Sequence, residues 1–269
     1  MGFRGTIGHE FVGVVDDLGS APTTLRLGQR VVGEINAGCG TCALCATGDS
    51  RHCATRTVLG IVARDGAHAD YLTLPARNLV LVPDSVGDLA AVFVEPLAAA
   101  CGVLERCPLT TSDRVAVIGD GKLGLLIAMA LQATGHAPVL VGKHAAKLAI
   151  AAARGIATTI ETPARGFDVV VEASGSAAGF ARALDLLRPQ GALVLKSTFH
   201  GTTPIDASRL VVDEIRVIGS RCGRFAPALE LLGELDLSPL VSEVLPLDRA
   251  EAAMVQAATP GILKVVLTR

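Results

Sequence analysis

The sequence has no tryptophan and one tyrosine among its 269 residues, and aromatic residues make up 3% of it. That scarcity argues against a surface on which single-stranded nucleic acid bases stack. An excess of one charge is also lacking, because 24 Lys and Arg are balanced by 26 Asp and Glu without a long run of either sign. Such a balance gives no electrostatic attraction for nucleic acid or an anionic membrane. We therefore predict a small-molecule ligand, with no nucleic-acid or membrane partner.

Long uninterrupted apolar segments are absent as well, although half of the residues are hydrophobic. Charged residues break the apolar runs before any of them reaches the roughly 18 residues that a membrane-spanning helix requires. The first ten residues, MGFRGTIGHE, lack the basic start and apolar stretch of a secretory signal. We expect a cytoplasmic protein with an aliphatic core, and the length suggests two domains.

From residue 115 onward, β-branched runs alternate with Ala- and Leu-rich segments, a pattern typical of a parallel sheet with helical crossovers. The predicted strands are 115–118, 138–141, 169–172, 192–196 and 215–218, and the predicted helices are 122–134, 145–154 and 177–187. Before residue 100, short runs punctuated by Gly and Pro predict antiparallel strands at 11–15, 30–34, 71–74 and 79–82. A joining helix is expected at 96–105, starting at the proline, and a last strand at 262–267. The predicted fold class is α/β.

Four of the seven cysteines lie within fifteen residues, in the pattern C-x2-C-x2-C-x7-C, at Cys39, Cys42, Cys45 and Cys53. Thiolates that tight turns bring together can surround one zinc ion, and four of them close its coordination sphere to water and substrate. Disulfides or a redox pair are the alternatives, but a reducing compartment favours metal binding. The spacing therefore predicts a structural zinc site, while isolated cysteines are expected to be small buried residues at Cys101, Cys107 and Cys222.

Gly119, Gly121 and Gly124 form a G-x-G-x-x-G motif directly after one predicted strand and at the start of a predicted helix. The first glycine permits a tight turn, the second lets the backbone approach a pyrophosphate, and the third lets helix and strand pack closely. The helix N-terminus then faces the phosphate charge. In this context the motif predicts a dinucleotide-binding site.

The end of the following strand indicates which dinucleotide is bound. An NAD-binding domain places Asp or Glu there to bind the ribose 2′-hydroxyl, but here the strand ends in Gly142-Lys143-His144. Lys143, with Lys147 one helical turn further on, would attract a 2′-phosphate. NADP is therefore favoured over NAD, the alternative being that both lysines are solvated surface charges.

The order of several motifs resembles that of the zinc-dependent medium-chain dehydrogenases/reductases, an alcohol and polyol dehydrogenase family. These motifs are Gly8-His9-Glu10, the four cysteines, Val94-Glu95-Pro96-Leu97 and the glycine-rich motif. The resemblance implies a Rossmann doubly wound parallel sheet and an incomplete GroES-like β-barrel catalytic domain. It places the catalytic domain at 1–105 with its C-terminal return at 224–269, and the Rossmann domain at 106–223. A homodimer or homotetramer, paired through the strand near 214–219, is also implied.

The resemblance further implies that His9 is a ligand of a catalytic zinc ion, with Glu10 near the metal. Glu95 would be a third ligand or a partner of the zinc-bound water, and Ser174 would lie beside the cofactor. The family has a cysteine ligand and a nearby hydroxyl upstream of the Gly-His-Glu motif, but only eight residues precede His9 here. We favour an internal Met of a longer functional protein over a shortened homologue as the explanation.

These observations predict a zinc-dependent oxidoreductase that transfers a hydride between NADP(H) and an alcohol, polyol, aldehyde or ketone. One alternative is a catalytically silent protein that still binds the nucleotide and the structural zinc. Another is a zinc-free quinone or enone reductase on the same fold, which the four cysteines and Glu95 argue against.

Overall fold

The computed structural model describes residues 3–20, 22–198 and 202–269, and the chain divides into two compact units. One unit is continuous, Pro96–Arg224, and the other joins Met1–Glu95 to Phe225–Arg269. In the part of the chain that is described, no helix has the length and apolar character needed to cross a membrane. Helices and parallel strands are combined along the chain, so the predicted α/β class is confirmed.

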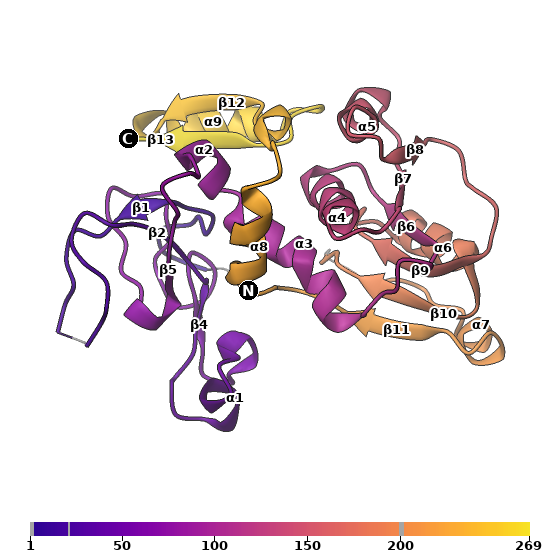
Figure 1. The fold of residues 1–269 in the computed structure, drawn as a ribbon, viewed down its shortest axis with the longest axis horizontal. Coiled ribbons are helices and arrows are strands. Elements are labelled where there is room, and N and C mark those ends of the chain that lie inside the picture. Colours follow the sequence, from indigo (N-terminus) through magenta and orange to yellow (C-terminus); the bar gives the residue numbers. More distant parts are fainter. Residues whose placement is uncertain (1–2, 21, 199–201) are drawn as a thin grey trace. The chain divides into compact units, whose positions relative to one another are not determined.

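The continuous unit is built on a six-stranded parallel sheet with the strand order β11-β10-β9-β6-β7-β8 (Figure 1). This order is that of a doubly wound dinucleotide-binding sheet. Its strands are β6 Val115–Ile118, β7 Val139–Val141, β8 Ala157–Thr159, β9 Phe167–Glu172, β10 Leu187–Leu195 and β11 Arg216–Gly219. Its helices are α4 Lys122–Ala133, α5 Ala145–Ala152, α6 Ala177–Leu186, α7 Ala207–Val212 and most of α3, Val94–Arg106.

The central strands have sequences that suit burial on both faces. β6, with the sequence Val-Ala-Val-Ile, is buried at every position, and so are the last four residues of β9. Strands of parallel sheets that helices cover on both faces consist of such continuous β-branched runs. α4 is likewise buried at every position from 124 to 131, as expected of a helix that is apolar on all sides. β6 and α4 match the predicted bounds to within one residue, whereas β9 begins two residues before the predicted start at 169.

Other parts of this unit differ from the sequence prediction. β10 begins at Leu187 rather than at 192, and its register shifts between Leu187 and Ala192, where Gln190 has a φ of 62°. A proline and a glycine in this stretch conceal the early start of the strand. β8 and α7 were not predicted, because elements of three and six residues are too short for a periodic pattern. α3 begins before the expected proline, which therefore lies within the first turn, where a missing N–H costs no helical hydrogen bond.

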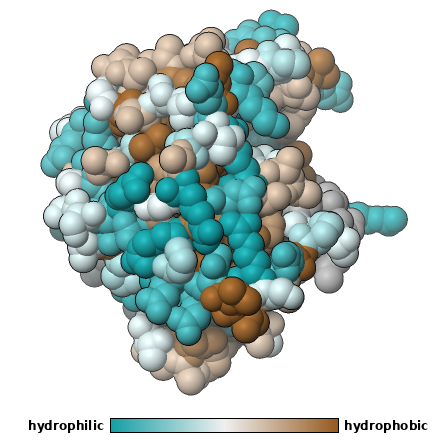
Figure 2. Space-filling view, turned by 90° about the vertical axis from the view of Figure 1, so that its right-hand side faces the viewer, coloured by the Kyte–Doolittle hydropathy of each residue, from teal (hydrophilic) through white to brown (hydrophobic). Residues whose placement is uncertain are grey.

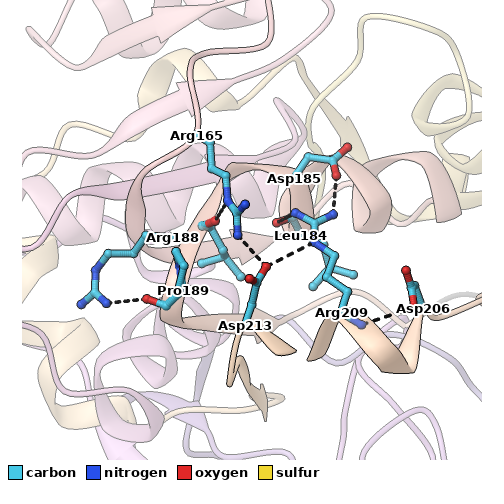
Figure 3. A network of polar contacts seen from close by, with 9 residues as sticks. Arg165, Leu184, Asp185, Arg188, Pro189, Asp206, Arg209 and Asp213 are labelled. Carbon is cyan, nitrogen blue, oxygen red and sulfur yellow. Dashed lines mark hydrogen bonds and ion pairs between the residues drawn. The ribbon is translucent and has the colours of Figure 1, made fainter. Parts of the chain in front are cut away.

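A network of ion pairs links α7 to the neighbouring elements (Figure 3). Asp213, directly after α7, accepts a hydrogen bond of 2.5 Å from Arg165 Nη2 and lies 3.7 Å from Arg209 Nε. Arg209 in turn donates to Asp185 of α6 at 2.5 Å, and Arg165 donates to the carbonyl of Leu187 at 2.6 Å. The network connects α7 with the end of α6 and the start of β10.

The described residues of the other unit form three small sheets, two antiparallel and one parallel. The antiparallel sheets contain β1 Gly13–Val14, β2 Arg30–Gly33 and β5 Leu79–Leu81, and the pair β3 Asn36–Ala37 and β4 Thr57–Val58. The parallel pair is β12 Glu243–Pro246 and β13 Val265–Thr268, connected through α9, Ala250–Ala257. The further α-helices of this unit are α1 Ala43–Ala46, α2 Asp88–Ala91 and α8 Phe225–Leu232.

The prediction of a strand at 71–74 is wrong, since this segment forms no strand. Leu72 and Leu74 pack against a small buried cluster formed by Ile35, Val58 and Leu59. The carbonyl of Thr73 accepts a hydrogen bond from the guanidinium of Arg64 instead of a neighbouring strand. The alternating pattern therefore reports the burial of two leucines and not pairing in a sheet.

Candidate metal and dinucleotide sites

The four cysteines of the predicted zinc site converge in a lobe formed by residues 39–53. Their sulfur atoms all lie within 4.8 Å of one another, and four thiolates around one zinc ion would be about 3.8 Å apart. α1 contains Cys45 and has Cys42 at its N-cap, and Cys53 follows a short 3-10 helix, Ser50–His52. Gly38 permits the close approach, because a Cβ there would lie 2.6 Å from Cys45 Sγ. The donor set fits a closed structural zinc site.

Hydrogen bonds to two of these sulfurs favour the thiolate form that a metal ion needs. Cys39 Sγ accepts bonds from the hydroxyl of Thr41 and from the backbone N–H groups of Thr41 and Cys42, which lower the pKa of Cys39 to about 5. The N–H of Cys39 bonds to Cys53 Sγ at 3.4 Å and lowers the pKa of Cys53. Because ligand thiols must lose their protons, these bonds favour metal binding at Cys39 and Cys53. At Cys45, a backbone bond from Gly40 is outweighed by burial and by hydrogen bonds with the neighbouring cysteines, which raise the pKa of Cys45 to about 11.

A second cluster combines the Gly-His-Glu segment with the first turn of α3. One ligand atom from each of His9, Glu10 and Glu95 lies within 4.8 Å of the other two. All three residues are half-buried. An imidazole nitrogen and carboxylate oxygens are the donors of catalytic zinc sites, which have three protein ligands and an open position. The structure thus brings together the three residues that the resemblance implies, and their donor types fit zinc.

Lys264 and His68 border this second cluster. Lys264 is only 8% exposed, its ammonium group pairs with the carboxylate of Glu10, and it lies 5.0 Å from the centre of the Phe93 ring. His68 lies directly against Gly8, where a Cβ would be 2.5 Å from the imidazole Cδ2. Burial lowers the pKa of His68, against the opposing charge of Glu10. Glu10 therefore has two roles to consider: it forms an ion pair with Lys264, and it belongs to the candidate metal cluster with His9 and Glu95.

The glycine-rich loop lies between β6 and α4, as predicted. Gly119 has a φ of 120°, and a Cβ there would lie 2.7 Å from the carbonyl oxygen of Ala173. A Cβ at Gly124 would overlap the carbonyl of Gly119. By contrast, a Cβ at Gly121 would meet nothing within 4 Å. The fold itself requires Gly119 and Gly124, whereas the open backbone of Gly121 at the start of α4 fits a pyrophosphate.

Asp120, between the first two glycines, binds the loop that follows β7. Its Oδ2 accepts the N–H groups of Lys143 and His144 at 2.6 Å each, and its Oδ1 lies 3.0 Å from Nδ1 of His144. Asp120 is 7% exposed. Burial acts to raise the pKa of Asp120, but the hydrogen bonds from His144 and Lys143 outweigh it, and the pKa is lowered. The carboxylate is therefore ionised at neutral pH.

The remaining residues predicted to bind the cofactor lie on or beside this loop. Lys143 is exposed directly after Gly142, and Lys147 is half-buried in the first turn of α5. Ser174 follows β9, and its N–H and hydroxyl both donate to the buried carboxylate of Glu172, at 2.7 and 2.6 Å. The backbone N of Ser174 would lie 2.9 Å from a Cβ at Gly119, so Ser174 borders the glycine-rich loop. Contact of these residues with a cofactor stays a prediction.

Asp120 and Lys264 are functional candidates that were not predicted from the sequence. Asp120 occupies a position of the G-x-G-x-x-G motif that is open to any residue, so the motif gives it no role. Lys264 is 254 residues from Glu10 in the chain. One signal was present, since Lys264 interrupts the apolar run 262–267. A lysine within an otherwise apolar run indicates a buried partner.

Two family models match the chain over separate ranges. Residues 2–84 match the alcohol dehydrogenase GroES-like domain, and residues 123–235 match the zinc-binding dehydrogenase family. An L-threonine 3-dehydrogenase of Chelativorans sp. (strain BNC1) is 34% identical over 79% of this chain and 65% of its own length. A sorbitol dehydrogenase of Halalkalibacterium halodurans is 30% identical over 98% of this chain and 83% of its own.

Solved structures with the same fold hold either dinucleotide. A zinc-binding dehydrogenase from Sinorhizobium meliloti 1021, bound to NADP, superposes with a TM-score of 0.89 at 27% identity, covering 98% of this chain and 84% of its own. The RspB alcohol dehydrogenase from Escherichia coli CFT073, complexed with NADH, superposes with a TM-score of 0.88 at 25% identity, covering 98% and 83%. The cofactor of this chain must therefore be inferred from its own residues.

Proposed function

Because the chain belongs to the zinc-dependent medium-chain dehydrogenase/reductase family of alcohol dehydrogenase-like oxidoreductases, we propose that it transfers a hydride between NADP(H) and an alcohol or polyol or the corresponding carbonyl compound. The main support is the convergence of His9, Glu10 and Glu95 around one point. A protein that only binds nucleotide needs the glycine-rich loop but has no use for these three groups.

In the proposed site, His9 and Glu95 hold a catalytic zinc ion, and Lys264 fixes the carboxylate of Glu10 beside it. When bound, zinc supplies Lewis-acid chemistry that lowers the pKa of a coordinated hydroxyl group. The cation of Lys264 is itself held by Glu10 and by the face of the Phe93 ring. The four-cysteine lobe holds a second zinc ion that has no open position and stabilises the loop.

For the dinucleotide, Gly119, Gly121 and Gly124 and the N-terminus of α4 hold the pyrophosphate, and Ser174 lies beside it. Lys143 and Lys147 hold the 2′-phosphate of NADP, because the position after β7 offers a glycine instead of an acidic residue. The bound cofactor supplies the hydride chemistry, and the protein supplies its orientation.

The domain roles, assembly and location expected from the sequence belong to the same proposal. Residues 1–105 and 224–269 form the catalytic domain, and 106–223 bind the dinucleotide. Homodimers or homotetramers form through the edge strand β11, whose Val217 is 44% exposed. On the face shown in Figure 2, hydrophilic residues gather in the centre, and more hydrophobic residues lie above and below them. We also propose a location in the cytoplasm, a reducing compartment in which free cysteines such as the seven of this chain persist. Light scattering after gel filtration measures the oligomeric state.

Zinc content per folded chain, measured by elemental analysis after loosely bound metal is removed, tests the catalytic proposal. We expect two zinc ions in the wild type and one in His9→Ala, with the control His136→Ala unchanged. Oxidation of alcohols and polyols, beginning with threonine and sorbitol, is then followed through the formation of NADPH. One zinc ion in the wild type, together with no turnover, would contradict the proposal that His9 and Glu95 hold a catalytic zinc ion in this chain.

A further inference from the structure

Gly142 occupies the position after β7 where an NAD-binding domain carries its acidic residue. A Cβ at Gly142 would lie 2.5 Å from Oδ2, 2.7 Å from Cβ and 2.8 Å from Cγ of Asp120. Gly142 is not among the glycines with a positive φ, so its backbone conformation would accept any residue. The three atoms nearest to such a Cβ therefore all belong to the side chain of Asp120.

The carboxylate of Asp120 is directed at the chain itself. Its Oδ2 accepts two backbone N–H groups and its Oδ1 faces the imidazole of His144. The N–H of Gly142 is bonded to the carbonyl of Thr159 at 3.0 Å. Backbone bonds thus fix the turn at 142–144, from which the exposed Lys143 and His144 project. The carboxylate of Asp120 thus holds a turn from which the cationic Lys143 and the imidazole of His144 project.

We propose that Asp120 and Gly142 together form one selectivity device for the dinucleotide. The side chain of Asp120 holds the turn that presents Lys143, and it also occupies the space that an acidic side chain at position 142 would need. Asp120 is a positioning residue, because it acts through the turn and not through contact with the 2′-phosphate. The proposal rests on the proposed function in requiring that the site prefers NADP. Its consequence is that a change of Gly142 alone cannot convert the site to NAD, whereas a change of both residues can.

Four proteins test the device in the full chain: the wild type, Gly142→Asp, Asp120→Ala and the double variant. Dissociation constants for NADPH and NADH are measured by calorimetric titration, and melting temperatures are measured without cofactor. Gly142→Asp should melt lower and bind both dinucleotides at least roughly tenfold more weakly, since two carboxylates would share one space. Asp120→Ala should weaken the affinity for NADPH roughly tenfold and change the affinity for NADH by less than about threefold.

The double variant decides between a device and two independent residues. Removing Asp120 opens the space at 142, so the double variant should melt higher than Gly142→Asp and should bind NADH more tightly than NADPH. Such a reversal of the effect of one substitution by the other shows direct coupling. Gly87→Asp is the control, because it adds the same charge where a side chain would meet nothing within 4 Å; it should match the wild type.

The failure of this inference is distinguishable from the failure of the proposed function. If the wild type prefers NADPH but Gly142→Asp alone prefers NADH and melts normally, the inference is overturned and the proposed function stands. An unchanged ratio of NADPH to NADH affinity in Asp120→Ala overturns it as well. If the wild type binds NADH more tightly, or neither dinucleotide, both are overturned before any variant is measured.

Discussion

The ammonium group of Lys264 lies against the carboxylate of Glu10, although 254 residues separate the two in the chain. The same ammonium group lies 5.0 Å from the centre of the Phe93 ring, two residues before Glu95. One buried cation therefore links the segment that supplies His9 with the segment that supplies Glu95. The position of the candidate catalytic residues depends on a residue near the C-terminal end of the sequence.

Lys264→Met should destabilise the unit to which Glu10 belongs. The substitution removes the cation that neutralises a carboxylate whose side chain is 19% exposed, and breaking such a pair from one side costs about 3 kcal/mol. The free energy of unfolding in urea measures the loss. Combined with Glu10→Gln, the same substitution should cost less than the sum of the two single losses. Losses that simply add would show that the two residues are not coupled.

Lys196→Met should weaken the continuous unit in a comparable way. Lys196 is 6% exposed, and its ammonium group donates to the carbonyls of Ala99 and Arg221 at 2.6 and 2.8 Å and to the hydroxyl of Ser220 at 3.3 Å. These bonds connect α3 to the segment after β11, and the loss of three hydrogen bonds around a buried lysine should cost about 3 kcal/mol. Lys143→Met, at an exposed position, should change the unfolding free energy by less than about 0.5 kcal/mol.

The continuous unit was predictable because its central elements are buried by their own sequence pattern. β6 and α4 are apolar throughout, so no tertiary information is needed to recognise them. The segment 71–74 also alternates in hydrophobicity, but its leucines pack against a small buried cluster. A pattern of burial does not specify a hydrogen-bonding partner. The edge strand β8 offers the opposite case, since it has a partner but little burial.

The candidate sites divide in the same way. The four cysteines lie close together in the sequence and could be assigned together, whereas the link from Asp120 to Lys143 and His144 depends on how β6 and β7 pair. Lys264 and Glu10 meet only because the C-terminal segment returns to the first unit. Residues that act through another residue have no spacing of their own, so the sequence shows what the motif needs but not what holds the motif in place.

Asp49 should contribute a measurable part of the stability at acid pH. Its hydrogen bond with Arg51, at 2.9 Å, lowers the pKa of Asp49 to about 2. A carboxyl with a lowered folded-state pKa stabilises the fold above its unfolded pKa of about 3.9, and this contribution disappears as the pH falls through that value toward 2. Urea unfolding of Asp49→Asn should therefore show a smaller loss of stability between about pH 4.5 and 3, by about 1 kcal/mol after solvent screening. Asp248→Asn is the control, and an identical slope in both variants would refute the assignment.

The four-cysteine lobe should depend on metal for its stability. Cys45→Ser removes one of four converging sulfurs, so the variant should lose one zinc ion per chain and melt lower by several degrees. Cys222→Ala, a cysteine outside the lobe, should keep the full zinc content. A strong chelator should lower the melting temperature of the wild type much more than that of Cys45→Ser. Equal sensitivity of the two proteins would mean that the lobe holds no ion.

Substitution of two glycines in the same loop should separate folding from binding. A Cβ at Gly124 would overlap the carbonyl of Gly119, so Gly124→Ala must displace α4 from β6 and should lower the free energy of unfolding by about 2 kcal/mol. Gly121→Ala meets nothing within 4 Å and has an ordinary φ of −74°, so its stability should stay within about 0.5 kcal/mol of the wild type. The added methyl group nevertheless stands where the pyrophosphate must approach the backbone. The affinity for NADPH should therefore fall at least about tenfold. Thermal unfolding and NADPH titration of the two variants measure both properties. If Gly121→Ala binds NADPH as tightly as the wild type, the dinucleotide does not lie on this loop, whatever the sequence motif indicates.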